Sequence, residues 1–185
     1  MYKFLIPILT RMFAKILLST LVVTTYIGWW QSKAVLGQEG SLHQITASTK
    51  TKSSQELEEI AQRAYVLVNQ YRATLDLAPL EFNSVISEQA RIHSENMAKQ
   101  KVKFGHDDFE NRVAALKNDL PYRSVAENVA YNMGYSDPAG RAVLGWIDSE
   151  GHRRNMVGNF NLTGIGVVKN EKDEYYFTQI FIREK

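Results

Sequence analysis

Apolar residues recur at the spacing of amphipathic helices in three parts of this chain. The first part spans residues 53–75 and begins with a capping box closed by Glu56. The second begins at Asn83 or the serine after it. The third follows Asp137 and its proline and ends near Gly151. The inward positions are Leu57, Ile60, Ala61, Ala64, Leu67, Val68 and Tyr71; Val85, Ile86, Ala90, His93 and Met97; and Ala139, Ala142, Val143, Trp146 and Ile147.

The end of the chain shows the pattern of a β-hairpin. Residues 163–168 and 175–182 are rich in branched and aromatic side chains, and a polar turn at 170–173 separates them. A short helix is expected over 112–116, and residues 125–131 form a compact apolar stretch interrupted by one acid and one amide. Because the helices precede most of the strand, we predict an α+β fold in which helices pack on an antiparallel sheet.

The amino terminus has the pattern of an export signal. Three basic residues precede an apolar run at 16–30, which is shorter than the ~20 residues that a membrane-spanning helix needs. Val35 and Gly37 are small residues before a cleavage point after Gly37. We expect residues 1–37 to be a cleaved signal peptide. The alternative is an uncleaved membrane anchor, since the apolar residues 4–9 lengthen the segment. Either way, the folded part lies outside the cytoplasm, in the extracellular space, periplasm or cell envelope.

The segment after this signal differs in composition from the rest of the chain. Residues 38–52 are polar, with few large apolar side chains, and predict a disordered linker. The folded domain is then expected to span residues 53–185.

Composition and charge exclude several classes of function. The chain is 44% hydrophobic, enough for a buried core, and it contains no cysteine, which rules out disulfides, thiolate metal sites and a cysteine nucleophile. The net charge of +2 comes from four bases in residues 1–37. Of the 22 bases in the chain, 18 remain against 20 acids, so the folded part has no basic surface for nucleic acid.

Four segments, taken in order, carry a family resemblance. They are Leu67-Val68-Asn69-Gln70-Tyr71-Arg72 with Pro79-Leu80, Gly105-His106-Asp107-Asp108-Phe109, Ala126-Glu127-Asn128-Val129-Ala130, and Trp146 to Met156 with its Gly151-His152-Arg153 core. Together with the closing strands, this set resembles the CAP superfamily, which holds the cysteine-rich secretory proteins, antigen 5, plant pathogenesis-related protein 1 and bacterial SCP-like relatives. The resemblance implies an α–β–α sandwich, with a central cleft that two histidines and two glutamates line in many members.

Matching this chain to the family motifs gives the candidate site residues. His106 matches the first histidine, Glu127 the first glutamate and His152 the second histidine. The position of the second glutamate holds Ser149. Glu150 beside it is a candidate replacement, although one residue along a helix rotates a side chain by about 100°. Two further candidates for the cleft are Asn128 and Arg153.

The chemistry of these residues suggests a metal site. Two imidazoles and the carboxylate of Glu127 are suitable ligands for Zn²⁺ and leave one position for water. The alternative is that Glu127 pairs with a histidine or caps backbone amides, in a loop beneath the helices. For Arg153 and Asn155, bonds to backbone carbonyls are favoured over binding of an anion. His93 is best interpreted as a satisfied core histidine.

Three functions remain open at this point. The favoured one is an extracellular binding module whose His/Glu cleft takes a divalent metal, a small polar ligand, or a lipid or cell-wall component. The second is a metal-dependent hydrolase acting on peptide or cell-wall material, and the third is a structural interaction domain at the envelope. The Gly-Xaa-Ser-Xaa-Gly motif of serine hydrolases is absent, and no catalytic residue is assigned.

Overall fold

The computed structural model describes residues 40–117 and 119–185. The predicted signal peptide lies outside these residues. The elements in chain order are α2 (Gly40–Ala73), β1 (Glu81–Phe82), α3 (Ser84–Ala98), α4 (Phe109–Ala114), β2 (Tyr122–Met133), α5 (Pro138–Asp148), α6 (Glu150–Val157), β3 (Leu162–Lys169) and β4 (Glu174–Glu184). Within the described part of the chain, no helix has the length and apolarity needed to cross a membrane.

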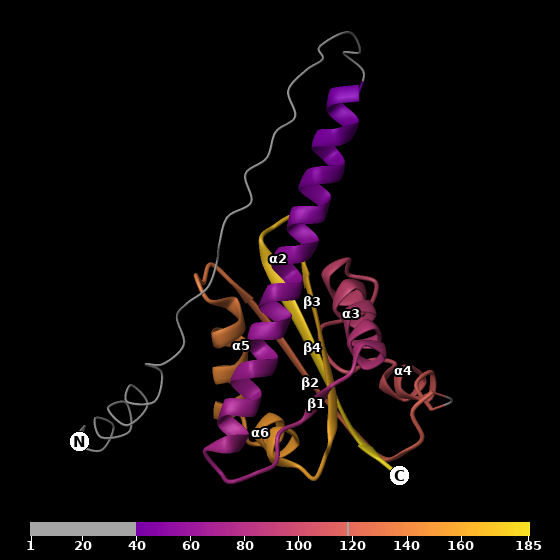
Figure 1. Ribbon diagram of the computed structural model, residues 1–185, viewed down its shortest axis with the longest axis vertical. Coiled ribbons are helices and arrows are strands. Elements are labelled where there is room, and N and C mark those ends of the chain that lie inside the picture. Colours follow the sequence, from indigo (N-terminus) through magenta and orange to yellow (C-terminus); the bar gives the residue numbers. More distant parts are fainter. Residues whose placement is uncertain (1–39, 118) are drawn as a thin grey trace, which may run out of the picture. The chain divides into compact units, whose positions relative to one another are not determined.

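The strands form one sheet in the order β1-β3-β4-β2, with helices on both faces (Figure 1). β4 pairs antiparallel with β3 on one side and with β2 on the other. β1 pairs with β3 in parallel over two residues, so the sheet is mixed rather than wholly antiparallel as predicted. The α–β–α sandwich and the 163–182 hairpin are confirmed.

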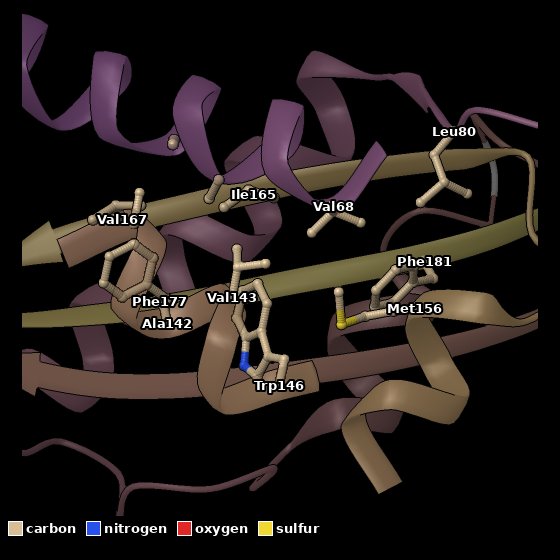
Figure 2. Packing of buried hydrophobic residues seen from close by; sticks show 13 residues of the cluster. Val68, Leu80, Ala142, Val143, Trp146, Met156, Ile165, Val167, Phe177 and Phe181 are labelled. Atoms are coloured by element: carbon tan, nitrogen blue, oxygen red, sulfur yellow. The ribbon is translucent and has the colours of Figure 1, made fainter. Parts of the chain in front are cut away.

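Alternation along β4 divides the core into two layers, because successive side chains of a strand point to opposite faces. Phe177 and Phe181 face α2, α5 and α6, where they pack with Val68, Val143 and Trp146 (Figure 2). Ile180 and Ile182 face α3 and α4, where they pack with Ile86, Ala90, Val113 and Leu116. The helices thus lie in two groups, and the site described below involves both.

Two glycines allow α3 to lie directly on β3. A Cβ atom at Gly164 would overlap the backbone of Ser87, and one at Gly166 would overlap the backbone of Arg91. Serines on α3 bond to the strand at the same level: Ser87 donates to the Ile165 carbonyl at 2.5 Å, and Ser94 donates to the Gly166 carbonyl at 3.0 Å. This close packing fixes the position of α3 and of the loop that follows it.

The first helix is longer than expected. Residues 40–52, which we predicted to be part of a disordered linker, are helical and continuous with the predicted helix. Residues 41–52 contain neither proline nor glycine. A helix that has nucleated in the following residues therefore extends back through them at low cost, since propagation adds a hydrogen bond for each residue fixed.

The second and third helices begin where the capping residues predict. Asn83 accepts hydrogen bonds from the Val85 and Ile86 amides, and Asp137 accepts one from the Gly140 amide. Val85, predicted to point inward, is exposed. The short helix covers 109–114 instead of 112–116.

Gly151 does not end the third helix as predicted. α5 ends at Asp148, Ser149 is extended, and a new helix, α6, continues through Gly151. Ser149 is the N-cap of α6, and its extended backbone, with φ of −87° and ψ of 119°, separates the two helices. His152 therefore lies in the first turn of a separate short helix.

Candidate functional site

The site is built at β2, the strand at one end of the sheet. This strand was not predicted, and residues 125–131 are its central part. Its outward carbonyls are bound by side chains from the neighbouring helices. The Trp146 indole donates to Val129 O, and the Asn155 amide donates to Glu127 O, both at 3.0 Å. These bonds give partners to backbone carbonyls on an exposed strand edge. They also hold α6, which carries His152, beside β2.

A buried histidine anchors the loop that carries His106. The His93 side chain on α3 is 1% exposed, and its Nε2 lies 2.8 Å from the carbonyl oxygen of Gly105. Because a carbonyl only accepts, Nε2 carries the proton. Burial is the main cause that lowers the pKa of His93, so the ring stays neutral. The prediction of a satisfied core histidine is confirmed, and the ring also fixes the residue before His106.

Glu127 is held by a buried arginine on α4. Arg112 on α4 donates from Nε to Glu127 Oε2 and from Nη2 to Oε1, both at 2.9 Å. The two side chains are 6% and 2% exposed, which makes this a buried ion pair. Arg112 also donates to the carbonyl of Asp107, next to His106. Both oxygens of Glu127 are therefore engaged inside the protein.

His106 completes this network at the surface. Its Nδ1 lies 3.0 Å from Glu127 Oε1, and its side chain is 51% exposed. A carboxylate accepts, so the hydrogen bond assigns the proton to Nδ1 and leaves the Nε2 lone pair free. Arg112, Glu127 and His106 thus form a hydrogen-bonded chain that runs from the interior to solvent. This chain orients the imidazole of His106.

His152 approaches His106 from the other helical layer. The ring centroids are 6.5 Å apart, with the planes tilted by 48°. Burial, followed by the nearby His106, lowers the pKa of His152, so its imidazole is neutral near pH 7. Two imidazoles that are remote in sequence thus lie side by side at the end of the sheet.

The remaining predicted residues have structural contacts. Asn128 is fully buried and donates to the His152 carbonyl, while its own oxygen accepts from Asn155. Arg153 donates to the Ile147 carbonyl at 2.7 Å. Glu150 is 75% exposed and pairs with Arg154 along the same helix. The structure thus places Asn128 beneath the site, Arg153 in a backbone contact and Glu150 in solvent.

Arg112 is the site residue that the sequence analysis missed. It lies among Phe109, Val113 and Leu116, which pack into the layer formed by α3 and α4. A charged residue on such an apolar stripe needs a buried partner. That pattern was the available signal, although the partner on β2 could not be read from it.

The donor set differs from the predicted three-ligand site. Over residues 40–117 and 119–185, no group of three or more His, Cys, Asp or Glu side chains has an arrangement that could hold a metal ion. Glu127 pairs with His106, as in the alternative reading, but it does so from a strand and not from a loop. The available metal donors are the two imidazoles, and Zn²⁺ binding stays a prediction.

Comparison with known proteins identifies similar sequences. The profile described as CAP, the cysteine-rich secretory protein family, matches residues 65–181. The chain is 38% identical over 123 residues to the uncharacterized membrane protein YlbC of Bacillus subtilis, covering 63% of this chain and 32% of that protein. It is 30% identical over 139 residues to the uncharacterized protein YkwD of the same organism, covering 73% and 51%. It therefore spans about a third to a half of the length of these relatives.

A solved structure shares the fold. It is that of an extracellular protein containing a SCP domain from Bacillus anthracis, with 29% identity and a TM-score of 0.57. The match covers 69% of this chain and 41% of that chain. The matched family region includes every residue of the network around His106 and His152.

Proposed function

This chain belongs to the CAP family of cysteine-rich secretory proteins, and on that premise we propose that it is an exported binding module that holds a divalent metal ion between His106 and His152. The observation that carries the proposal is the approach of the two rings, with centroids 6.5 Å apart, at the end of the sheet. The two histidines come from different helical layers and meet beside the strand that carries Glu127.

The protonation states suit a metal site. Nδ1 of His106 donates a hydrogen bond to Glu127. The Nε2 lone pair is then the one that can ligate a metal on the solvent side. A carboxylate behind a ligating histidine fixes the ring and increases its basicity. The lowered pKa of His152 keeps that ring neutral, as metal ligation requires. Glu127 thus supports His106 and is not itself a ligand.

The cost of the network also favours a function. Burying Arg112 and Glu127 requires both charges to lose water, and an apolar pair of similar size would often be at least as stable. Such a pair placed behind a half-exposed histidine is explained more simply by the need to orient that histidine.

The residues fit a metal anchored by two imidazoles. Zn²⁺ is an ion that imidazole nitrogens suit well, as they do other divalent transition metals. When bound, it would supply open coordination positions for an external ligand. The chain itself contributes the two nitrogens, the orientation of His106 and the neutral state of His152.

Export is part of the proposal. The first 37 residues have the pattern of a signal peptide, and the similar Bacillus anthracis protein is described as extracellular. The ligand is then expected outside the cytoplasm.

Isothermal titration of the purified protein with ZnCl₂ tests the proposal. Wild type is expected to bind one ion, and His106→Ala and His152→Ala are each expected to lose more than about tenfold in affinity. His43→Ala, in the first turn of α2, is the matched control and should bind as wild type does. Absence of zinc binding by wild type, or equal affinity in all four proteins, would overturn the proposal.

A further inference from the structure

A cluster of aromatic rings lies along β2 from the histidine pair. Tyr131 on β2 and Tyr176 on β4 are direct cross-strand partners, with ring centroids 5.2 Å apart. Phe104, from the loop that carries His106, meets Tyr131 edge-to-face at 6.3 Å. Phe104 is 54% exposed and Tyr131 is 43% exposed. We call these three rings the aromatic shelf. Tyr176 is buried, at 9% exposed, so Phe104 and Tyr131 supply the exposed surface of the shelf. Contiguous exposed apolar surface on a folded protein marks interaction sites and ligand-binding grooves.

One carboxylate holds the shelf in place. The hydroxyls of Tyr131 and Tyr176 donate to the two oxygens of Glu174, at 3.1 and 3.2 Å. The Asn170 amide also donates to Glu174, at 2.5 Å. Both tyrosine rings are thus fixed before any ligand arrives, which reduces the entropy lost on binding.

A hollow of about 390 Å³ adjoins the shelf. Its wall is formed by residues 100–104, Met97 and Tyr176, and no carboxylate lines it. Lys101 and Lys103 both lie in this wall. In the described part of the chain neither lysine forms an ion pair, whereas Lys99, two residues before Lys101, pairs with Glu95. The hollow therefore offers positive charge beside exposed ring faces.

From this combination we propose that the aromatic shelf and its hollow bind an acidic oligosaccharide, a chain of sugar rings that carry carboxylates. The C–H faces of sugar rings stack on flat aromatic side chains, whose apolar bodies and polar tips suit amphipathic ligands. The carboxylates pair with Lys101 and Lys103, and the hydroxyls find partners in Gln100 and the tyrosine hydroxyls. No reaction is involved.

Other classes of ligand fit this surface less well. An extended peptide would add to a free strand edge. The β2 edge is occupied nearby, since Trp146 and Asn155 bind the carbonyls of Val129 and Glu127. An acyl chain needs an apolar channel without charge, but two lysines line this hollow.

The shelf is separate from the histidine pair but lies on the same face of the sheet. Glu127 and Tyr131 are four residues apart on β2, which corresponds to about 13 Å along a strand. Phe104 and His106 belong to the same loop. An oligosaccharide of several rings can span both places, yet its binding to the shelf does not depend on the metal.

Titration calorimetry of the purified protein in EDTA, with hexagalacturonate and with its fully methyl-esterified form, tests the proposal. The two probes have the same rings and differ in charge. Wild type is expected to bind both, and the acid about tenfold or more tightly at low salt. Phe104→Ala and Tyr131→Ala are each expected to weaken the binding of both probes at least about tenfold. The Lys101→Ala/Lys103→Ala variant is expected to lose only the preference for the acid.

Matched controls make the outcome decisive. Phe82→Ala removes a ring that is 44% exposed and also meets a tyrosine edge-to-face, but lies on β1. Lys117→Ala removes an exposed lysine after α4. Tyr131→Phe keeps the ring without its bond to Glu174 and should retain most of the binding. The proposal is overturned if wild type binds neither probe, if the control variants weaken binding as much as the shelf variants, or if an acidic peptide binds more tightly than hexagalacturonate.

Discussion

Arg112 on α4 and Glu127 on β2 form a bidentate ion pair that is almost completely buried. The pair joins the helical layer of α3 and α4 to the last strand of the sheet. It also fixes the carboxylate that orients His106. Folding stability and the geometry of the candidate site therefore depend on the same two side chains, and variants can separate these two effects.

Removing one partner of this pair should destabilise the protein strongly. Arg112→Met leaves the Glu127 carboxylate buried without its counter-charge, which costs about 3–5 kcal/mol in comparable cases. Urea unfolding followed by circular dichroism measures the loss. In the Arg112→Met/Glu127→Met variant both charges are gone, and most of the stability should return. A double variant as unstable as Arg112→Met would show that packing, not charge, explains the effect.

Stability should fall as the solution is acidified from pH 7 to pH 5. Burial lowers the pKa of His93 and of His152 below the value of 6.5 for a free histidine. The unfolded chain therefore binds more protons in this range, and stability, fully present above pH 6.5, is lost as the pH falls toward the folded pKa values. Each histidine contributes at most about 1.4 kcal/mol per pH unit.

Some groups around His93 raise its pKa and others lower it. A variant is therefore needed to identify how much His93 contributes to the pH dependence of stability. Arg112 and His106 lower the pKa of His93 further, while its bond to Gly105 and the nearby Glu127 raise it. His93→Gln keeps a donor for the Gly105 carbonyl without a titrating ring. Unfolding curves in EDTA at pH 7, 6 and 5 should show a weaker pH dependence in this variant. An unchanged dependence would exclude His93 as a source.

Local patterns predicted the elements whose signals are local. The caps at Asn83 and Asp137 and the hairpin turn at 170–173 depend on a few neighbouring residues, and they mark elements that the structure contains. β2 has no such signal. The consecutive residues Glu127 and Asn128 of this strand point to opposite faces of the sheet, and both are polar and buried. In a strand with ordinary alternation, one of these two positions would hold an apolar residue.

The site shows the same limit. Resemblance placed His106, Glu127 and His152 together, and their spacing alone could not. Whether Glu127 reaches solvent depends on Arg112, which packs against it from another element. Non-local packing of this kind decides which residues are ligands and which are supports, and one sequence does not contain it in readable form.

Gly166 on β3 and Gly145 on α5 should respond in opposite ways to alanine. A methyl group at Gly166 would overlap the backbone of Arg91, so Gly166→Ala is expected to separate α3 from β3 and cost at least about 1–3 kcal/mol. Nothing lies within 4 Å of the Cβ position at Gly145 on α5. Gly145→Ala should therefore gain about 0.5–1 kcal/mol from helix propensity. Thermal unfolding of both variants checks this, and a stable Gly166→Ala protein would contradict the close packing of α3.

Glu127→Gln distinguishes a supporting carboxylate from a metal ligand. The amide can still accept a hydrogen bond from His106, but it carries no charge to make that ring more basic. Loss of a partner behind a ligating histidine typically costs 10–100-fold in metal affinity. We therefore expect zinc binding to weaken by about that factor while the stoichiometry is kept. The zinc affinities of both variants are measured by competition with a chromogenic chelator, and His106→Ala should lose more affinity than Glu127→Gln.

Circular dichroism is the control for folding. It is needed because Arg112 loses its counter-charge in Glu127→Gln. If Glu127→Gln abolishes binding as completely as His106→Ala in a folded protein, Glu127 is a direct ligand and must leave Arg112 to bind the ion.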